Sequence, residues 1–591
     1  MNAADERTPL EDALVLLRAG KIAQARAILE TLAARFPRDP EIALTLGSLL
    51  MHDRPADALP LFQLVTEGAP HLAIAHLNMG LSLRALGRWA EASDAFLATL
   101  RLQPGDGVTL FHAIKTLVDL GNLDAAIALH RDSVPLLSDP QYLPSLAVAL
   151  LPEVAASAAD LHRARAAYED AIANLGVPRG RVGLNALLDV TGQFFAGYQG
   201  YPNRAQQCQI ADYYAALCPD LAFTAPMRAG GAERLRVGFA SANFYNHTIG
   251  KLMRGLIARL DRSRFEVFVF STRPPTDARG REIARSCDSF TVLPRDIADA
   301  RRLIADAALD VLVYPDIGME SFFYFLAFAR LAPVQCVTWG HPVTTGIPAI
   351  DYFISSRDLE ADEAARAQDH YSERLVRLNA PPTYLYPVPA STADMCPDLS
   401  FARGRTIYTC VQHPLKFHPD FDRALIDILR RDPDGILILL DLYPHLTERL
   451  LARLARGDGE VRARIHILPR LEPGAFFELL KASHVILDTF PFSGGISSAE
   501  TLGLGKIVVT WPHPDQMPGR VSYAYYRQMG LDVGVARDLD HYVDITVRFG
   551  TDAHAREDAE HSIRDRAQRL FNDDSVLREF EAFFRDARSA V

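Results

Sequence analysis

A period of about 34 residues in the first 140 positions is the feature that most restricts how this 591-residue chain can fold. Four anchor residues mark the period: Gly20, Asp53, Gly87 and Gly121. Alanine stands five positions after each anchor, at Ala25, Ala58, Ala92 and Ala126, and the residues 17 positions after the anchors are Pro37, Pro70, Pro104 and Ser138. A glycine at a turn, a small residue where helices cross and a proline after the second helix predict stacked helix pairs.

These positions match the tetratricopeptide repeat, so we predict a superhelical repeat domain at 1–140. Such stacks enclose an inner groove that can hold a segment of another protein. An ordinary helical bundle is the alternative, but four copies in one register favour the repeat. From 141 to 232 the sequence keeps a helical pattern but loses the period, which predicts an irregular helical connector. The segment 219–233, with two prolines and a glycine pair, is the predicted boundary.

Beyond residue 233, short apolar strands alternate with helical stretches. Strands are predicted at 235–240, 265–270, 309–314, 334–339 and 351–355, and again at 406–411, 435–440, 464–468, 485–487 and 506–510. The proline-rich segment 381–389 separates the two sets, which predicts Rossmann-like lobes at 233–390 and 391–591, closed by an amphipathic helix at 575–588. Ligands of open α/β sheets bind beyond the carboxyl ends of the strands, so the two lobes should enclose a cleft.

Composition excludes several classes of protein. The net charge of -11 and the pI near 5.9 argue against binding to nucleic acid. No run of eighteen apolar residues occurs, and the amino terminus lacks the apolar core of a signal peptide, so we expect a cytoplasmic protein without a membrane partner. The six cysteines are scattered and predict neither a zinc site nor disulfides. The aspartate pairs at 432/434 and 538/540 are predicted to lie in solvated loops, not at a metal.

The segment after the predicted strand at 485–487 combines a glycine pair with two serines at the start of a helix. Gly494 and Gly495 let a ligand approach the backbone, while Ser497 and Ser498 offer a capping hydroxyl and free amides. The helix dipole also favours an anion at this end. We therefore predict a phosphate-binding turn; a strand-to-helix turn without a ligand is the alternative.

This order of domains, together with four ordered segments, resembles the O-GlcNAc transferase family, including its plant SPINDLY-like and bacterial members. The segments run from Leu235 to Thr248, Arg330 to Tyr352, Gln412 to Pro419 and Leu487 to Ser498. The resemblance implies α superhelical repeats followed by an α/β GT-B glycosyltransferase that moves a sugar from a nucleotide-sugar to Ser/Thr of a protein held by the repeats. It also implies inversion at the anomeric carbon, no metal and no cofactor besides the nucleotide-sugar substrate. The bacterial members suggest flagellin as one acceptor.

Lys416 and His247 are the predicted catalytic residues. Lys416 is one of only six lysines, and an ammonium opposite the serine-rich helix end would neutralise a diphosphate leaving group, the role that the family implies. His247 follows the first strand, where an imidazole can accept a proton from the acceptor hydroxyl or hold the sugar. A solvent-facing lysine and a helix-capping histidine are the structural alternatives.

Further donor contacts are predicted from both lobes. Thr344 and Thr345 place two hydroxyls beside a glycine at a strand end. Glu500 lies where the family has an acidic residue near the nucleotide ribose. Gly495 replaces the histidine of a His-Thr-Thr sequence in the animal enzymes, and Phe476 falls at a nucleoside-facing position, where its ring could stack on a base. These departures leave the donor open, with a cytidine-activated nonulosonic acid as conceivable as a UDP sugar.

Two other functions stay open from the sequence. One is a protein N-glucosyltransferase of the adhesin-modifying type, which the segments 314–319 and 340–345 also resemble. The other is a repeat scaffold that carries a degenerate transferase. The lost His-Thr-Thr favours the scaffold, whereas the retention of Lys416 and His247 opposes it.

Overall fold

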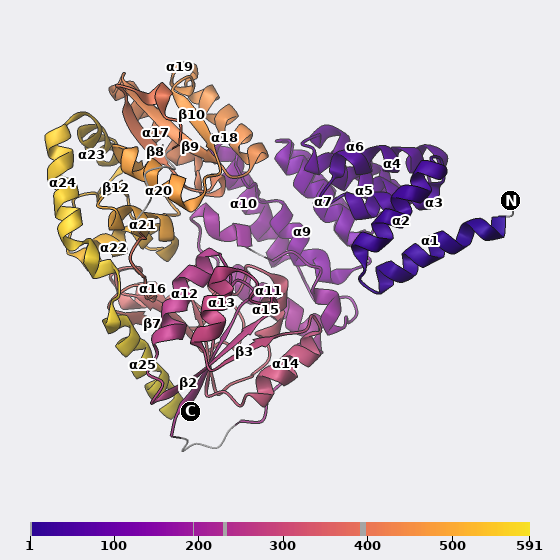
Figure 1. The fold of residues 1–591 in the computed structure, drawn as a ribbon, viewed down its shortest axis with the longest axis horizontal. Helices are drawn as coiled ribbons and strands as arrows, with labels where there is room; N and C mark the ends of the chain where they lie inside the picture. Colours follow the sequence, from indigo (N-terminus) through magenta and orange to yellow (C-terminus); the bar gives the residue numbers. More distant parts are fainter. Residues whose placement is uncertain (1–2, 193, 228–232, 390–396, 591) are drawn as a thin grey trace. The chain divides into compact units, whose positions relative to one another are not determined.

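The computed structural model describes residues 3–192, 194–227, 233–389 and 397–590 (Figure 1). Three features of the sequence lie outside these residues: Cys396, the glycine pair at 230–231 and the predicted lobe boundary at 390–391. The chain forms two compact units, Met1–Pro152 with Arg163–Ala171, and Glu153–His162 with Ile172–Val591. In the part of the chain that the structure describes, no helix combines the length and the apolar character needed to cross a bilayer.

The first unit is a stack of antiparallel helices. They are α1 (Ala3–Arg18), α2 (Ile22–Arg35), α3 (Pro40–Leu50), α4 (Pro55–Gly68), α5 (Ala73–Ala85), α6 (Trp89–Leu102), α7 (Gly107–Asp119), α8 (Leu123–Ser133) and α9 (Leu143–Ala149). The four repeated alanines are fully buried, as expected where helices cross. Gly20, Gly87 and Gly121 have φ values of 71, 73 and 79°, which explains why glycine recurs at the turn within a pair.

A contact between a glycine and an aromatic ring recurs in two successive helix pairs, α3 with α4 and α5 with α6. A Cβ added at Gly47 would lie 2.8 Å from the ring of Phe62, and one at Gly80 would lie 2.5 Å from the ring of Phe96. Both rings are fully buried. The helices therefore approach closely where a large aromatic side chain faces a glycine, and this contact recurs one repeat later.

The connector belongs mainly to the second unit and has little regular structure. It consists of α10 (Ala158–Ala173), the 3₁₀ turns η3 (Leu184–Leu187) and η4 (Phe194–Gln199), and α11 (Arg204–Leu217). Gln207 and Ile210 of α11 are buried. A Cβ at Gly346 of the first lobe would lie 2.3 Å from the carbonyl oxygen of Gln207, so the backbones of connector and lobe meet directly.

The first lobe is a seven-stranded parallel sheet in the order β3-β2-β1-β4-β5-β6-β7. Its strands are β1 (Leu235–Ala240), β2 (Phe265–Ser271), β3 (Ser289–Val292), β4 (Val311–Tyr314), β5 (Val334–Thr338), β6 (Tyr352–Ser356) and β7 (Arg374–Leu378). Its helices are α12 (Thr248–Arg259), α13 (Ala278–Ser286), α14 (Ile297–Asp306), α15 (Ser321–Leu326) and α16 (Ala364–Gln368). Val237 pairs with Val267 and Val311 on either side, so β1 is central and apolar.

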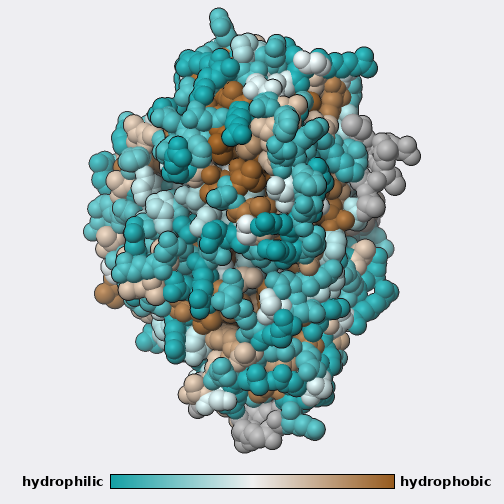
Figure 2. All heavy atoms as spheres, turned by 90° about the vertical axis from the view of Figure 1, so that its left-hand side faces the viewer, coloured by the Kyte–Doolittle hydropathy of each residue, from teal (hydrophilic) through white to brown (hydrophobic). Residues whose placement is uncertain are grey.

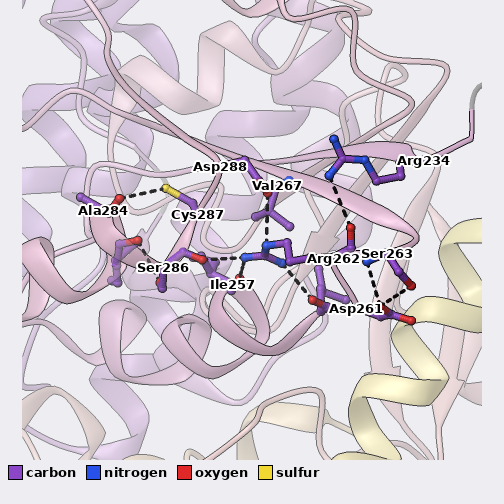
Figure 3. Close-up of polar contacts among 12 residues, drawn as sticks. Arg234, Ile257, Asp261, Arg262, Ser263, Val267, Ala284, Ser286, Cys287 and Asp288 are labelled. Atoms are coloured by element: carbon purple, nitrogen blue, oxygen red, sulfur yellow. Dashed lines mark hydrogen bonds and ion pairs between the residues drawn. The ribbon is translucent and has the colours of Figure 1, made fainter.

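One arginine joins the elements at the amino-terminal side of this sheet (Figure 3). The guanidinium of Arg262 donates to the carbonyl oxygens of Ile257 and Ser286, each at 2.6 Å, and forms an ion pair with Asp288. The Asp288 carboxylate in turn accepts from the amide of Val267 at 2.8 Å. This network ties α12, α13 and β2 together at the edge opposite the strand ends where ligands bind.

The second lobe is a five-stranded parallel sheet in the order β10-β9-β8-β11-β12. Its strands are β8 (Thr406–Cys410), β9 (Gly435–Asp441), β10 (Ile465–Pro469), β11 (Val485–Leu487) and β12 (Val508–Val509). Its helices are α17 (Pro419–Arg431), α18 (Pro444–Gly457), α19 (Gly459–Arg462), α20 (Pro473–Ala482), α21 (Ile496–Gly503), α22 (Val521–Met529), α23 (Leu539–Thr551) and α24 (Ala553–Arg566). The repeats and the two parallel sheets confirm the predicted fold class.

The last helix, α25 (Asp574–Ser589), crosses back to the first lobe (Figure 1). Its Glu579 accepts from the amide of Asn379, its Glu581 accepts from the amide of Asp261, and the ring of Phe584 packs on Phe265. The sequence placed all of 391–591 in the second lobe, yet these contacts join α25 to the first. On the face drawn in Figure 2, hydrophilic side chains predominate and hydrophobic ones gather in narrow strips between them.

Candidate active site

A cavity of about 810 Å³ lies between the two lobes. The lobes contribute to its walls through the segments that follow β1 and β5 in the first lobe and β8, β9 and β11 in the second. In both sheets the strand order reverses next to these strands, at β1/β4 and at β8/β11. Parallel sheets bind ligands at such switch points because the loops there diverge to opposite faces. The cavity therefore lies where the lobes were expected to enclose a cleft.

Asp488 fixes the loop after β11. Its buried carboxylate accepts from the amide of Gly494 and from the hydroxyl of Thr510, the latter at 2.8 Å. Burial raises the pKa of Asp488, while these hydrogen bonds act in the opposite direction. A Cβ at Gly494 would lie 2.2 Å from the Ser498 hydroxyl oxygen and 2.6 Å from the side-chain nitrogen of Gln412. Glycine is thus required at 494 for packing inside the loop.

The amino terminus of α21 opens onto the cavity without a side-chain cap. The cap position is Gly495, so the prediction that the hydroxyl of Ser497 or Ser498 caps this helix is wrong. Within the described part of the chain, the amides of Ile496 and Ser497 have no acceptor. Ile496, Ser497 and Gly495 all line the cavity. Uncapped amides at the positive end of a helix dipole are suited to an anionic ligand.

Lys416 lies opposite this helix end, in the turn η8 (Pro414–Lys416) after β8. Its Nζ donates to the side-chain oxygen of Gln412 and to the carbonyl oxygen of Ser493, both at 2.9 Å. Gln412 donates in turn to the hydroxyl of Ser497 at 3.0 Å. Burial lowers the pKa of Lys416 to about 8, against the opposing effect of the Asp488 carboxylate. The ammonium and the helix amides therefore approach the same part of the cavity from two sides.

His247 is the cap residue of α12, and its ring faces the cavity. Its Nδ1 accepts from the amide of Ile249 at 3.2 Å, so the neutral ring carries its proton on Nε2. Burial, and then the nearby charge of Arg273, lower the pKa of His247 and favour this neutral form. In this tautomer the ring offers a hydrogen-bond donor to the cavity, which suits positioning of a hydroxyl better than removal of its proton.

Glu500 crosses the cavity to pair with a lysine of the other lobe. The Nζ of Lys251 lies 2.6 Å from its Oε1, and both side chains line the cavity. The sequence had not singled out Lys251, although it stands four positions after His247 and therefore on the same helix face. The pair joins α12 to α21 beside the free helix amides.

Comparison with known proteins places these residues in a family. Residues 203–386 and 400–579 match Glycosyl transferase family 41, which is more than half of the chain. The chain belongs to glycosyltransferase family 41. Residues 10–73, 49–107 and 77–136 of this family 41 chain match the tetratricopeptide repeat, as the period predicts.

Named relatives of the family 41 chain come from plants and bacteria. A probable UDP-N-acetylglucosamine–peptide N-acetylglucosaminyltransferase SPINDLY of Solanum lycopersicum is 27% identical over 349 residues, which cover 56% of this chain and 36% of the relative. A UDP-glucose:protein N-beta-glucosyltransferase of Actinobacillus pleuropneumoniae is 25% identical over 297 residues, covering 48% of this chain and 45% of the relative. The chain thus spans about a third to a half of the length of these relatives.

A solved structure extends the likeness to the whole architecture. A mutant of Thermobaculum terrenum O-GlcNAc transferase superposes with a TM-score of 0.69 at 23% identity, covering 93% of this chain and 98% of the other. At this identity the match concerns the fold. It includes both the repeats and the two-lobed GT-B region of the family 41 chain.

Five of the predicted site residues line the cavity of the family 41 chain, and five do not. Those that line it are His247, Lys416, Gly495, Ser497 and Glu500. Gly494 faces the interior of its loop, and the hydroxyl of Ser498 is buried against that of Ser522 at 2.8 Å. Phe476 lies on α20, packs edge-on against Phe477 and does not line the cavity. The structure therefore does not support the predicted donor contacts at these three positions.

Thr344 and Thr345 have a structural partner instead of a ligand. The Thr344 hydroxyl donates to the carboxylate of Glu373 at 2.6 Å, and the Thr345 hydroxyl and amide donate to the same carboxylate at 2.5 and 2.8 Å. All three residues are buried. Their hydrogen bonds hold the loop after β5 against the loop before β7, so the predicted donor contact is not supported.

Three rings in the cavity were missed as site residues. His341 is buried and donates through Nδ1 to the carbonyl oxygen of Ile317 at 2.9 Å, while burial lowers its pKa to about 4. His413 accepts through Nδ1 from the amide of Leu415, and its ring packs on Tyr443 with centroids 4.7 Å apart. Tyr443 is 47% exposed, which is unusual for an aromatic ring after a buried strand. The position of Tyr443 directly after a predicted strand was the sequence signal that could have identified it as a site residue.

Proposed function

We propose that this protein is an O-glycosyltransferase that moves a sugar from a nucleotide-sugar donor to Ser/Thr of a protein acceptor. The observation that carries the proposal is the convergence of Lys416, the uncapped amino terminus of α21 and His247 on one cavity between two lobes. A partly buried cation facing free helix amides matches the charge of a departing nucleotide phosphate. The named functions of the plant relatives agree with this reaction class.

In the proposed reaction, the acceptor hydroxyl oxygen bonds to the anomeric carbon and inverts it while the bond from that carbon to the nucleotide phosphate breaks. The nucleotide leaves with the bonding electron pair, and the hydroxyl proton passes to water in the cavity. The Lys416 ammonium and the amides of Ile496 and Ser497 stabilise the negative charge that grows on the leaving phosphate. The Nε2–H of His247 holds a hydroxyl of the acceptor or the sugar in line. No metal is needed in this scheme, because the protein itself supplies the positive charge, and no cofactor is proposed.

Full activity in EDTA is the expected result, whereas a loss of activity that Mg²⁺ restores would contradict the metal-independent scheme.

The acceptor is proposed to be a protein held by the repeats, with flagellin as one candidate. Mass spectrometry of proteins from cells with the native gene, without it and with a Lys416→Ala copy tests this directly. A glycan on serine or threonine that disappears in the last two strains supports the proposal and identifies donor and acceptor together. The location in the cytoplasm stays a prediction.

A protein N-glucosyltransferase is the second candidate, and the relative from Actinobacillus favours it. The same experiment separates the two, because a hexose on asparagine would replace the glycan on serine or threonine. If no glycan disappears, the third possibility, a repeat scaffold with a degenerate transferase, gains support.

The rate should depend on the protonation of Lys416. Its pKa of about 8 means that the free enzyme loses the cationic form as pH rises through 8. We expect kcat/KM for the donor to fall above pH 8, approaching about tenfold per pH unit. Lys416→Arg is the matched control, since a guanidinium stays protonated and should remove this alkaline limb even if the overall rate is lower. An unchanged limb in Lys416→Arg would assign it to another group.

The donor pocket should bind UDP-GlcNAc weakly. Gly495 and Ile496 offer backbone amides where the animal enzymes have polar side chains, and the exposed Tyr443 ring gives a stacking surface that does not discriminate between bases. We expect a Kd for UDP-GlcNAc weaker than micromolar, measured by calorimetry beside UDP, CMP and their sugar conjugates. Micromolar or tighter binding, with turnover on a serine peptide, would show that these substitutions do not disfavour the family's common donor.

A further inference from the structure

The connector contributes one wall of the cavity through the turn η4. Phe194, Phe195, Gly197 and Tyr198 all line it, although they precede both lobes in the sequence. The ring of Tyr198 stacks on that of Phe492 in the second lobe, with centroids 4.5 Å apart and planes 20° apart. Burial raises the pKa of the Tyr198 phenol, as expected for a ring inserted between other groups.

Phe492 is also the ring that faces Lys416. The Nζ of Lys416 lies 4.9 Å from its centroid, within the range of a cation–π contact. The next residue, Ser493, supplies the carbonyl oxygen to which the same Nζ donates at 2.9 Å. The position of the ammonium therefore depends on both the ring and the backbone of residues 492–493.

The connector is held firmly where Tyr198 makes this contact. Gly200 has a φ of +74°, and a Cβ there would lie 2.5 Å from the side chain of Pro491. The carbonyl oxygen of Gly200 accepts from Gln516 at 3.2 Å. On the other side, a Cβ at Gly197 would lie 2.9 Å from Val343 of the first lobe. Close backbone approaches on both sides of Tyr198 leave its ring little freedom to leave Phe492.

We propose that Tyr198 is a positioning residue for Lys416: by stacking on Phe492 it fixes the ring and loop that hold the ammonium and excludes water from it. The catalytic importance of Tyr198 rests on the proposed function. Its effect on the position and solvation of Lys416 does not. It makes the connector a working part of the transferase site, beyond its role as a link to the repeats.

The groups around Lys416 give the expected direction of change. Burial lowers its pKa to about 8, whereas Asp488 and Cys410 act to raise it, and His413 lies close enough for the ammonium to lower the pKa of that ring. Removing the Tyr198 ring would admit water beside Phe492 without altering those three groups. Relief of desolvation should then raise the pKa of Lys416.

The chain is well suited to a direct measurement, because it contains only six lysines. Protein labelled with ¹³C-lysine gives six Cε signals, and Lys416→Arg identifies the one that belongs to Lys416. We expect this signal to titrate near pH 8 in the native protein and about one pH unit higher in Tyr198→Ala. No donor or acceptor is required, so the measurement stands even if the proposed reaction is wrong.

Three variants complete the experiment. Tyr198→Phe keeps the stacked ring and should keep the native titration. Tyr198→Leu removes the ring but keeps an apolar side chain, and it replaces the alanine variant in the measurement if that variant does not fold. Phe223→Ala removes another connector aromatic, which packs on Arg301 and does not line the cavity, and should leave the signal unchanged. An unshifted signal in both Tyr198→Ala and Tyr198→Leu, or an equal shift in Tyr198→Phe or Phe223→Ala, would overturn the proposal.

Discussion

Lys416→Ala should lower sugar transfer by about two to three powers of ten while the protein stays folded. This is the usual effect of removing one group that stabilises charge in the transition state. The substitution removes the cation opposite the uncapped end of α21 and leaves Gln412 and Ser493 to be solvated by water. The effect should appear in kcat more than in donor KM, because the charge on the leaving group develops only as the bond breaks.

Lys481→Ala is the matched control for this prediction. Lys481 lies on α20 in the same lobe, is 41% exposed and pairs with Glu478 at the surface. An ion pair made by an exposed lysine contributes little, so its loss should leave both transfer and melting temperature nearly unchanged. Transfer within a few fold of native in Lys416→Ala, with its folding verified by circular dichroism, would remove Lys416 from the mechanism.

Deleting the repeats should separate catalysis from acceptor selection. A protein that begins at Glu153 keeps the connector and both lobes. We expect it to retain donor binding and slow donor hydrolysis but to lose modification of its intact protein target by at least about tenfold, since the repeats no longer raise the local concentration of the acceptor. Calorimetry, nucleotide release and mass spectrometry of the target measure the three activities.

The starting point of the shortened protein is critical. The boundary that the sequence predicts at 219–233 would place the cut near residue 229, but that cut also removes Phe194 and Tyr198, which line the cavity. A second protein that begins at 229 should therefore lose donor hydrolysis as well, whereas the longer one should not. Equal modification of the intact target by the full chain and by the protein that begins at Glu153 would show that the repeats serve another purpose.

The two lobes differ in how completely their strands could be predicted. Buried parallel strands are apolar on both faces, so β4, β9 and β11 stand out as short runs dominated by Val, Ile and Leu. The edge strands β3 and β7 were missed. Arg374–Leu378 is interrupted by two arginines and is partly exposed, and Ser289–Val292 is short and has no fully buried residue. Edge strands lack the continuous apolar pattern because one side of them meets solvent.

Some residues of the candidate site could also be predicted from the sequence, whereas others could not. His247, Lys416 and Glu500 could be selected because each follows a strand or begins a helix in an ordered motif. Thr344 and Thr345 follow a strand equally well, but their hydrogen bonds go to Glu373, which stands 29 and 28 residues further along the chain. No local pattern reveals that partner. The contact of Tyr198 with Phe492 spans almost 300 positions and is equally invisible in the sequence.

The sequence by itself therefore determined the repeat period, the two sets of parallel strands and the loops in which catalytic residues lie. Those features depend on interactions within one helix, one strand or one turn, where residue spacing decides which side chains are buried. Only the tertiary structure decided which polar groups remain available to a ligand. A hydroxyl or a helix amide is free or occupied according to the hydrogen-bond partners that folding brings from distant segments. Glu373 is brought to the threonines as an acceptor, and the side-chain amide of Gln412 is brought to the Ser497 hydroxyl as a donor.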